Sequence, residues 1–194
     1  EHLGPADFGI WMTGVSITAL AAFMDFGIAN SLLTRLAVYF GQSDVASARR
    51  AIAASYRILC IVFFGGMAVM GTALLVTIMW PGAVQSRGYD GYGLIFIVLF
   101  FFFLGMPCSV IHRILYAHQQ IILYNVILVA QSALSVVVTL WVIGIGLSGW
   151  AVVSVYSGVP IVVSVIASIW YFNVYPVYRP RLLDFAPGED SRSL

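Results

Sequence analysis

The sequence predicts an all-α membrane protein, a polytopic bundle of about five transmembrane helices, and three observations support this. Of the 194 residues, 61% are hydrophobic and only 9% are charged, whereas a water-soluble domain carries charge on roughly a quarter of its residues. The apolar residues gather into runs of about 20, the length with which a helix crosses a bilayer. The runs are apolar on all sides, unlike the short alternating strands of a membrane barrel.

The crossings follow in order from where the apolar runs begin and end. The charge-free residues 121–172 would form a helix far longer than the ~30 Å hydrocarbon core, so this stretch has to turn back once. The glycine-rich segment 144–149 suits the turn, because glycine tolerates turn geometry. The expected crossings are residues 8–26, 58–80, 91–111, 121–143 and 150–172. Residues 1–172 then form one transmembrane bundle, and residues 173–194 form a cytoplasmic linker.

The positive charges predict which side of the membrane each connection faces. Every basic residue other than histidine is an arginine, and Arg87 stands alone between the second and third crossings. The connections on the other side hold Arg35, Arg49, Arg50, Arg57, Arg113, Arg179, Arg181 and Arg192. Because arginine and lysine concentrate in cytoplasmic loops, we expect residues 27–57, the loop 112–120 and the C-terminal tail in the cytoplasm. The N-terminus then lies outside, and we expect one more helix before Glu1.

The helix of the second crossing is expected to begin well before its apolar run. Ser43 suits the N-cap of a helix that opens at Asp44, and a carboxylate is favourable in the first turn. This helix would begin in water, carry Arg49, Arg50 and Arg57, and continue into the membrane. Long arginine side chains near the boundary can extend to the headgroups.

Polar residues gather on particular helix faces when the sequence is wound at 100° per residue. After the first crossing, Asn30 and Thr34 share a face with Arg35 at its edge. In the fourth crossing one side holds Asn125, Ser132, Ser135 and Thr139, with Gln131 near the edge. Such stripes let membrane helices pack closely and share hydrogen bonds. Where several stripes converge they line a hydrated cavity, and the sequence leaves both interpretations open.

Asp25 is a carboxylate at the end of the first crossing. With Phe26 and Gly27 it spells the Asp-Phe-Gly of protein kinases. The chain has no lysine, no glycine-rich phosphate loop and no His-Arg-Asp motif, which excludes a kinase. Two roles remain open: Asp25 anchors a helix near the cytoplasmic boundary, or it is a gate carboxylate that pairs with Arg35, Arg57 or Arg113.

Other chemical classes lack the residues they need. His112 and His118 flank Arg113, but a metal site would need further ligands at suitable spacing, so we expect no metal and interfacial histidines. Cys60 and Cys108 lie in apolar runs and are expected to be small hydrophobic side chains. Without a catalytic or ATP-binding motif we expect no enzyme and no cofactor. The net charge of +1 argues against a nucleic-acid partner, which needs a clustered basic surface.

Three motifs occur in order in the first third of the chain. Leu3 to Trp11 fits Leu-Gly-x-x-x-Phe/Tyr-Gly-Ile/Leu-Trp, and Asp25 to Arg35 is an Asp-x-Gly-Ile/Leu that leads a small-residue helix ending in arginine. Gly41 to Arg50 is a Gly-x-x-Asp loop with arginine. With the linker-like Tyr175 to Phe185, these motifs resemble bacterial O-antigen and capsule polysaccharide flippases of the multidrug/oligosaccharidyl-lipid/polysaccharide exporter superfamily.

The resemblance implies helices two to six of a MATE-like six-helix lobe, with a second lobe in a missing C-terminal half. It implies a flippase of the bacterial inner membrane that moves undecaprenyl-pyrophosphate-linked oligosaccharides by alternating access, coupled to an ion or proton gradient, for cell-surface polysaccharide biosynthesis. Its partners would be membrane lipids and the lipid-linked oligosaccharide. The alternatives are a drug/ion antiporter-like transporter of the same superfamily and a non-catalytic membrane scaffold.

A buried pyrophosphate requires arginine forks or helix N-termini. The candidate substrate or cavity residues are Asp25, Asn30, Thr34, Arg35, Arg57, Arg113, Asn125 and Ser132.

Overall fold

The computed structural model describes Met12, residues 28–79 and residues 89–181, and within them it confirms the all-α class. The elements are α2 (Ile28–Gly41), α3 (Val45–Met79), α4 (Tyr89–Cys108), α5 (Val110–Ala117), α6 (Ile121–Gly144), α7 (Gly149–Val174) and a short 3₁₀ turn η2 (Pro176–Tyr178). Within the described ranges, four segments are long and apolar enough to cross a membrane: Val45–Val76, Ile95–Ala117, Ile121–Gly144 and Gly149–Val174. The first expected crossing, residues 8–26, lies outside the described residues apart from Met12.

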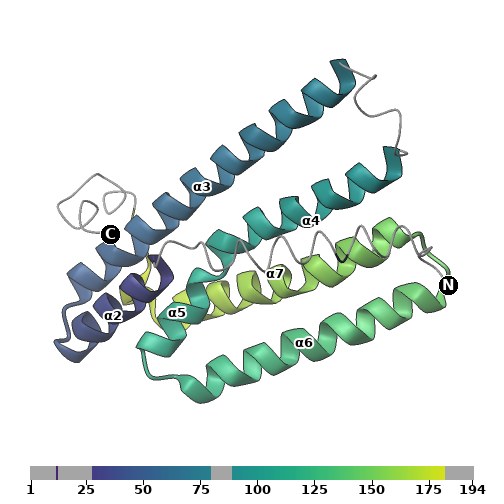
Figure 1. Cartoon of the computed structure of the whole chain (residues 1–194). Helices are drawn as coiled ribbons and strands as arrows, with labels where there is room; N and C mark the ends of the chain where they lie inside the picture. The colour runs from purple at the N-terminus through teal and green to yellow at the C-terminus, as the bar shows by residue number, and fades with distance from the viewer. Residues whose placement is uncertain (1–11, 13–27, 80–88, 182–194) are drawn as a thin grey trace.

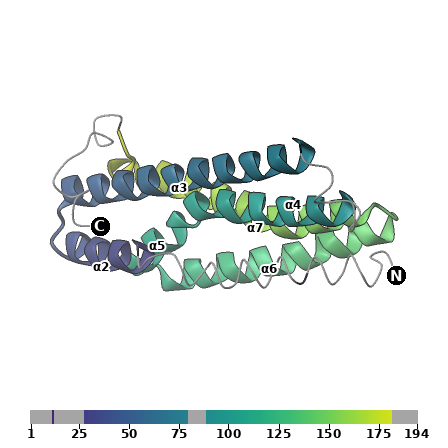
Figure 2. The same ribbon diagram turned by 45° about the horizontal axis from the view of Figure 1, so that its top comes forward.

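The long helices lie side by side, and the short ones gather at one end (Figure 1). Helix α4 packs against α3 and α7, and α6 packs along α7. Helix α2 packs against α3 and α5, which places both short helices beside the first turns of α3. In both views the α2–α3 and α5–α6 connections share this end, while the end of α3 and the α6–α7 turn lie at the opposite one (Figure 2).

Helix α3 runs without interruption from Val45 to Met79, which confirms that the second crossing starts far ahead of its apolar run. Its N-cap differs from the one expected. The carboxylate of Asp44 accepts a hydrogen bond from the backbone N–H of Ser47 at 3.1 Å. Ser43 instead has a positive φ of 56°, in the tight turn that follows α2. An aspartate caps a helix as well as a serine does, and here the turn geometry decides between the two.

The third crossing consists of two helices, α4 and α5. The prediction that residues 112–120 form a loop is wrong, because most of them belong to α5. Helix α4 contains Pro107 and ends one residue later at Cys108, where proline removes a backbone donor and disrupts the helix. A second helix, α5, then continues to Ala117, so only three residues connect it to α6. The reason is the amphipathic spacing of α5, which buries Val110, Ile111, Ile114 and Leu115 against the bundle.

The turn expected between the fourth and fifth crossings is confirmed. Helix α6 ends at Gly144 and α7 begins at Gly149. Gly146 has a φ of 71°, a left-handed conformation that glycine adopts without the steric penalty of a Cβ.

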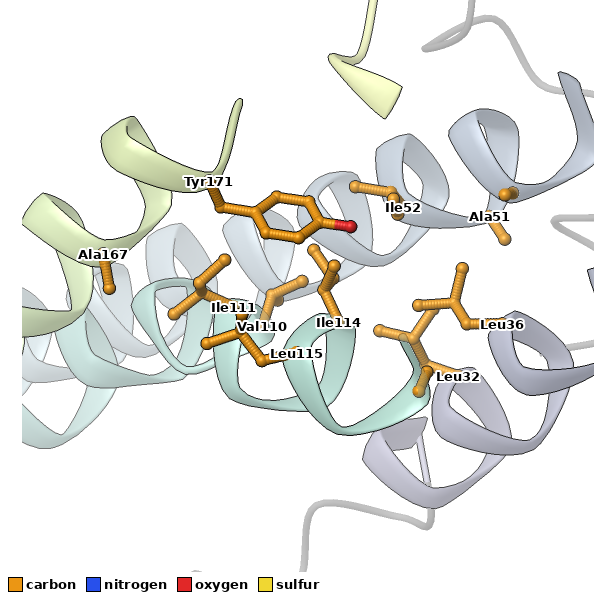
Figure 3. Close-up of a cluster of buried hydrophobic side chains, with 12 residues drawn as sticks. Leu32, Leu36, Ala51, Ile52, Val110, Ile111, Ile114, Leu115, Ala167 and Tyr171 are labelled. Atoms are coloured by element: carbon orange, nitrogen blue, oxygen red, sulfur yellow. The ribbon is translucent and has the colours of Figure 1, made fainter. Parts of the chain in front are cut away.

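The main hydrophobic core lies where α2, α3, α5 and α7 meet, at the end that holds the short helices (Figure 3). Tyr171 of α7 extends across it, with Leu32 and Leu36 of α2 on the far side and Ile52 of α3 behind. The second half of α3 is different, because its large apolar side chains face outward: Ile61, Phe64, Val69, Leu74, Leu75, Val76 and Met79. Apolar side chains exposed along most of this half suit contact with lipid.

Away from the core, glycines allow aromatic rings to pack between helices. A Cβ at Gly66 of α3 would lie 2.6 Å from the ring of Phe103 in α4. A Cβ at Gly93 of α4 would overlap the indole ring of Trp150 in α7. Close approach at small residues is how membrane helices gain packing energy in the absence of a hydrophobic driving force.

We predict that Gly66→Ala lowers the Tm of the purified protein, because a methyl group forced into a packed site costs about 1–3 kcal/mol. The neighbouring Gly65→Ala is a matched control, since nothing lies within 4 Å of its Cβ position. The control should leave Tm unchanged or raise it slightly, as alanine is the better helix former. Equal Tm values for the two variants in a thermal-shift measurement would contradict this packing.

Candidate functional site

One end of the bundle is strongly basic. The arginines among the described residues all belong to α2, the first half of α3, α5 and the segment around η2: Arg35, Arg49, Arg50, Arg57, Arg113, Arg179 and Arg181. Asp44 is the acidic residue described there. Hydrogen bonds from Ser47 hold the pKa of Asp44 below its ordinary value, so it is ionised and serves as the cap of α3. The described part of this end, called the basic end below, therefore carries a positive field that attracts anions and anionic headgroups.

Helix α5 presents a polar face opposite its core face. The face holds His112, Arg113 and Tyr116, while the other side of the helix is buried in the core. Tyr124 of α6 lies beside it: its ring centroid is 5.9 Å from that of His112 and 5.6 Å from that of Tyr116, both edge-on. A cation, an imidazole and two phenol rings therefore line one surface at the end of the third span.

His112 is fixed by α7. Its Nε2 lies 3.1 Å from the Oγ of Ser164, and that hydroxyl donates its proton to the carbonyl of Pro160 at 2.8 Å. Because the serine proton is already used, His112 has to be the donor, which places the hydrogen on Nε2. The Nδ1 atom is then a bare acceptor, and it is buried with no hydrogen-bond partner.

Arg113 is partly buried, one turn before α5 ends. Among the described residues no carboxylate pairs with it; the group that it affects electrostatically is the imidazole of His112. An unpaired guanidinium near a membrane boundary extends toward the headgroups or binds an anion, because its five N–H donors require acceptors.

A second cluster surrounds His118, at the turn between α5 and α6. Its ring lies 4.8 Å from Phe40 of α2, 4.9 Å from Tyr175, 5.7 Å from Tyr178 and 5.9 Å from Tyr171. The hydroxyl of Tyr171 is 3.2 Å from Nδ1 of His118. Four segments of the chain therefore meet on one imidazole.

This aromatic cluster borders a hollow of about 480 Å³ between α2 and α5. Its polar lining comes from Thr34, His118 and Gln119, and Phe40 and Tyr116 supply aromatic walls. Gln119 has a positive φ of 58°, uncommon for a residue with a Cβ, so the backbone of this turn is strained. Gln120 stabilises the other side of the turn, where its amide donates to the hydroxyl of Tyr175 at 2.7 Å.

The structure separates several of the residues that the sequence places together. Asp25 lies outside the described residues. Asn30 is exposed at the start of α2, where its carbonyl accepts from Thr34, while Arg35 and Arg57 are partly buried in α2 and α3. On α6 the expected stripe divides: Asn125 and Ser132 are exposed, whereas Ser135 is buried. Ser132 lines an apolar groove along α6 rather than the hollow beside Thr34.

The cluster at His118 is not apparent from the sequence. The sequence predicts an interfacial polar residue at this position. In the structure, His118 contacts three tyrosines from the end of α7 and from η2. Tyr171, Tyr175 and Tyr178 stand at i, i+4 and i+7, a helical spacing that puts aromatic rings on one face and could have indicated a packing site. Their partner comes from more than 50 residues earlier, which spacing cannot reveal. No group of three or more metal-ligating side chains gathers in residues 28–79 or 89–181.

We predict that acid destabilises the protein through His118. Burial lowers the pKa of His118 from its ordinary value of 6.5, so the folded state holds the extra proton less readily than the unfolded chain. The associated stability is present above pH 6.5 and is lost as the pH falls below it. Tm should therefore drop between about pH 7.5 and pH 5, and less so in His118→Phe, which keeps a ring in the cluster. The same drop in both proteins would contradict this.

Comparison with known proteins does not supply a function. No family model, no curated protein and no solved structure matches the chain. The function has to be inferred from the chemistry of the basic end together with the motifs in the first third of the sequence.

Proposed function

We propose that the chain is part of a flippase of the bacterial inner membrane that transports lipid-linked oligosaccharides. The observation that carries the proposal is the polar face of α5, where Arg113 has no carboxylate partner among the described residues and lies next to His112, Tyr116 and Tyr124. This combination suits a ligand that has an anionic group joined to sugar rings.

The arginine and the tyrosines on this face have roles that fit such a ligand. The guanidinium of Arg113 donates paired hydrogen bonds to phosphate oxygens, and its planar fork does so better than an ammonium group. Tyrosine rings offer apolar faces for stacking and a hydroxyl for hydrogen bonding, as sugar rings require.

The arginines of the basic end support transport that starts from the cytoplasmic side. Arginine-rich connections face the cytoplasm, so α2, α5 and η2 would lie on the side where lipid-linked sugars are assembled. The proposal includes a second helical bundle in the same polypeptide, which would face this one and complete a cavity that opens alternately to each side. It also includes the motif residue Asp25 as a gate carboxylate near the cytoplasmic boundary.

We predict that Arg113→Ala lowers the rate of oligosaccharide-lipid translocation by roughly 10- to 100-fold, since a charge-assisted hydrogen bond is worth about 1.5–3 kcal/mol. The assay would reconstitute the complete polypeptide in vesicles and follow the translocation of a labelled polyprenyl-pyrophosphate oligosaccharide to the opposite leaflet.

Arg179→Ala is the matched control. Arg179 belongs to the same basic end but is exposed just after η2, so its loss should change the rate less than twofold. If the two variants lost transport rate equally, with equal amounts of protein in the vesicles, Arg113 would contribute only to the overall surface charge and would not bind the substrate. Transport of small organic cations with no movement of the oligosaccharide lipid would replace the proposal with an antiporter.

A further inference from the structure

Two cysteines from different helices lie close together at the seam between α3 and α4. Cys60 belongs to α3 and Cys108 is the last residue of α4; both are free thiols and partly buried. The two thiols interact electrostatically, and the phenol group of Tyr56, one turn before Cys60, interacts with both of them. The two sulfur atoms therefore belong to one local cluster.

The packing of α3 on α4 places the two cysteines at the same level. The two helices run in opposite directions (Figure 1), and Gly66 of α3 lies against the ring of Phe103 of α4. Cys60 stands before Gly66 in α3, and Cys108 stands after Phe103 in α4. At 1.5 Å per residue these offsets are about 9 Å and about 7.5 Å in the same direction, so the two levels differ by only about 1.5 Å.

Cys60 lies on the face of α3 that meets α4. Met67 and Leu74 follow it at heptad spacing, which keeps all three residues within about 40° of one another around the helix. Both Met67 and Leu74 line an apolar groove that α3 shares with α4. From the other side Phe100 lines the same groove, two turns before Cys108.

The distance between packed helices suits a disulfide at this position. Helix axes in contact are roughly 8–10 Å apart, and Cα atoms lie about 2.3 Å from their own axis. Cα atoms that face each other are then roughly 3.5–5.5 Å apart, and the distance grows as either residue turns away from the contact line. Because a disulfide joins Cα atoms about 4.4–6.8 Å apart, it suits two residues near this line at one level.

We propose that Cys60 and Cys108 are a pair that hydrogen peroxide oxidises to a disulfide between α3 and α4. The thiolate of one cysteine attacks a peroxide oxygen, the O–O bond breaks, and a sulfenic acid and a water molecule form. The thiol of the other cysteine then attacks the sulfenic sulfur, so that the S–S bond forms, the S–O bond breaks and a second water leaves. Two thiols and one peroxide thus give one disulfide and two waters, which carry away both thiol protons.

The depth of the pair favours this reaction over metal binding. Arg57 is the last charged residue of α3, and Cys60 lies about 4.5 Å beyond it, close enough to the headgroup layer for a small uncharged oxidant to arrive. A disulfide is uncharged, whereas two thiolates around a monovalent soft metal ion would leave a negative charge, which hydrocarbon disfavours. Within residues 28–79 and 89–181 no third metal-ligating side chain joins the pair.

The disulfide would join α3 to the end of α4, directly beside the break that follows Pro107. It would therefore fix the seam between the second and third crossings at the membrane boundary. The inference concerns this chain alone and does not depend on which substrate is transported.

The test treats membranes that contain the complete polypeptide with hydrogen peroxide and blocks the remaining thiols with N-ethylmaleimide. The monomer band of a non-reducing gel is then digested with trypsin, which cleaves after arginine. Cleavage after Arg57, Arg87 and Arg113 places the two cysteines in separate peptides, residues 58–87 and 88–113. Mass spectrometry without reduction should find these two peptides joined.

The double variant Leu104→Cys, Cys108→Ser is the matched control, because it keeps one thiol in each peptide. It moves the thiol of α4 by one turn, about 6 Å along the axis, away from the level of Cys60. The amount of joined peptide should fall at least tenfold. Equal amounts in the two proteins would show that the thiols meet without regard to register and would overturn the proposal. Unmodified protein in which both thiols stay reduced, or are bridged only between two copies, would overturn it as well.

Discussion

The structure depends on one constraint: in hydrocarbon, every polar group has to be satisfied within the protein or by something that the protein encloses. The backbone meets this constraint by being helical through nearly all of the four described spans. Most hydroxyl groups meet it by bonding to carbonyls of their own helix, which allows serine and threonine into the spans at little cost. His112 and Ser164 meet it jointly across two helices.

Much of the fold follows from the sequence, because the length of an apolar run determines a crossing and glycine marks where it turns. The Gly144–Gly149 turn is predicted for these reasons and is found. The early start of α3 is predicted from the capping signal beside Asp44 and is also found. The division between α4 and α5 is harder. Pro107 predicts a kink, but the continuation of the chain as a buried helix depends on α2 and α7, which cover Ile111 and Ile114. Hydropathy alone shows an apolar run that ends at His112, and it does not show that α2 and α7 pack over the residues that follow.

The candidate site is less predictable than the fold, since it depends on pairs of residues far apart in the chain. Arg113 is identifiable from the sequence as a charge at the end of an apolar run. Its neighbour Tyr124 is not, because the turn at residues 118–120 brings α6 back beside α5. Helical periodicity placed Asn125, Ser132 and Ser135 within one arc, and packing then cut that arc in two. Helical periodicity gives the direction in which a side chain leaves its helix, but it does not show where the neighbouring helix lies.

The length of α3 determines the depth of the basic end relative to the hydrocarbon core. Its 35 residues extend about 52 Å, well beyond the ~30 Å hydrocarbon core. The uncharged part after Arg57 spans about 33 Å, one core thickness, so the earlier turns lie in the headgroup layer. The Ala51–Ile52 contacts with α2 and α5 are at that level. The basic end is therefore a small collar at the membrane boundary, held together by ordinary hydrophobic burial of about 25 cal/mol per Å². A charged lipid headgroup would therefore contact this collar while the headgroup is still in the aqueous phase.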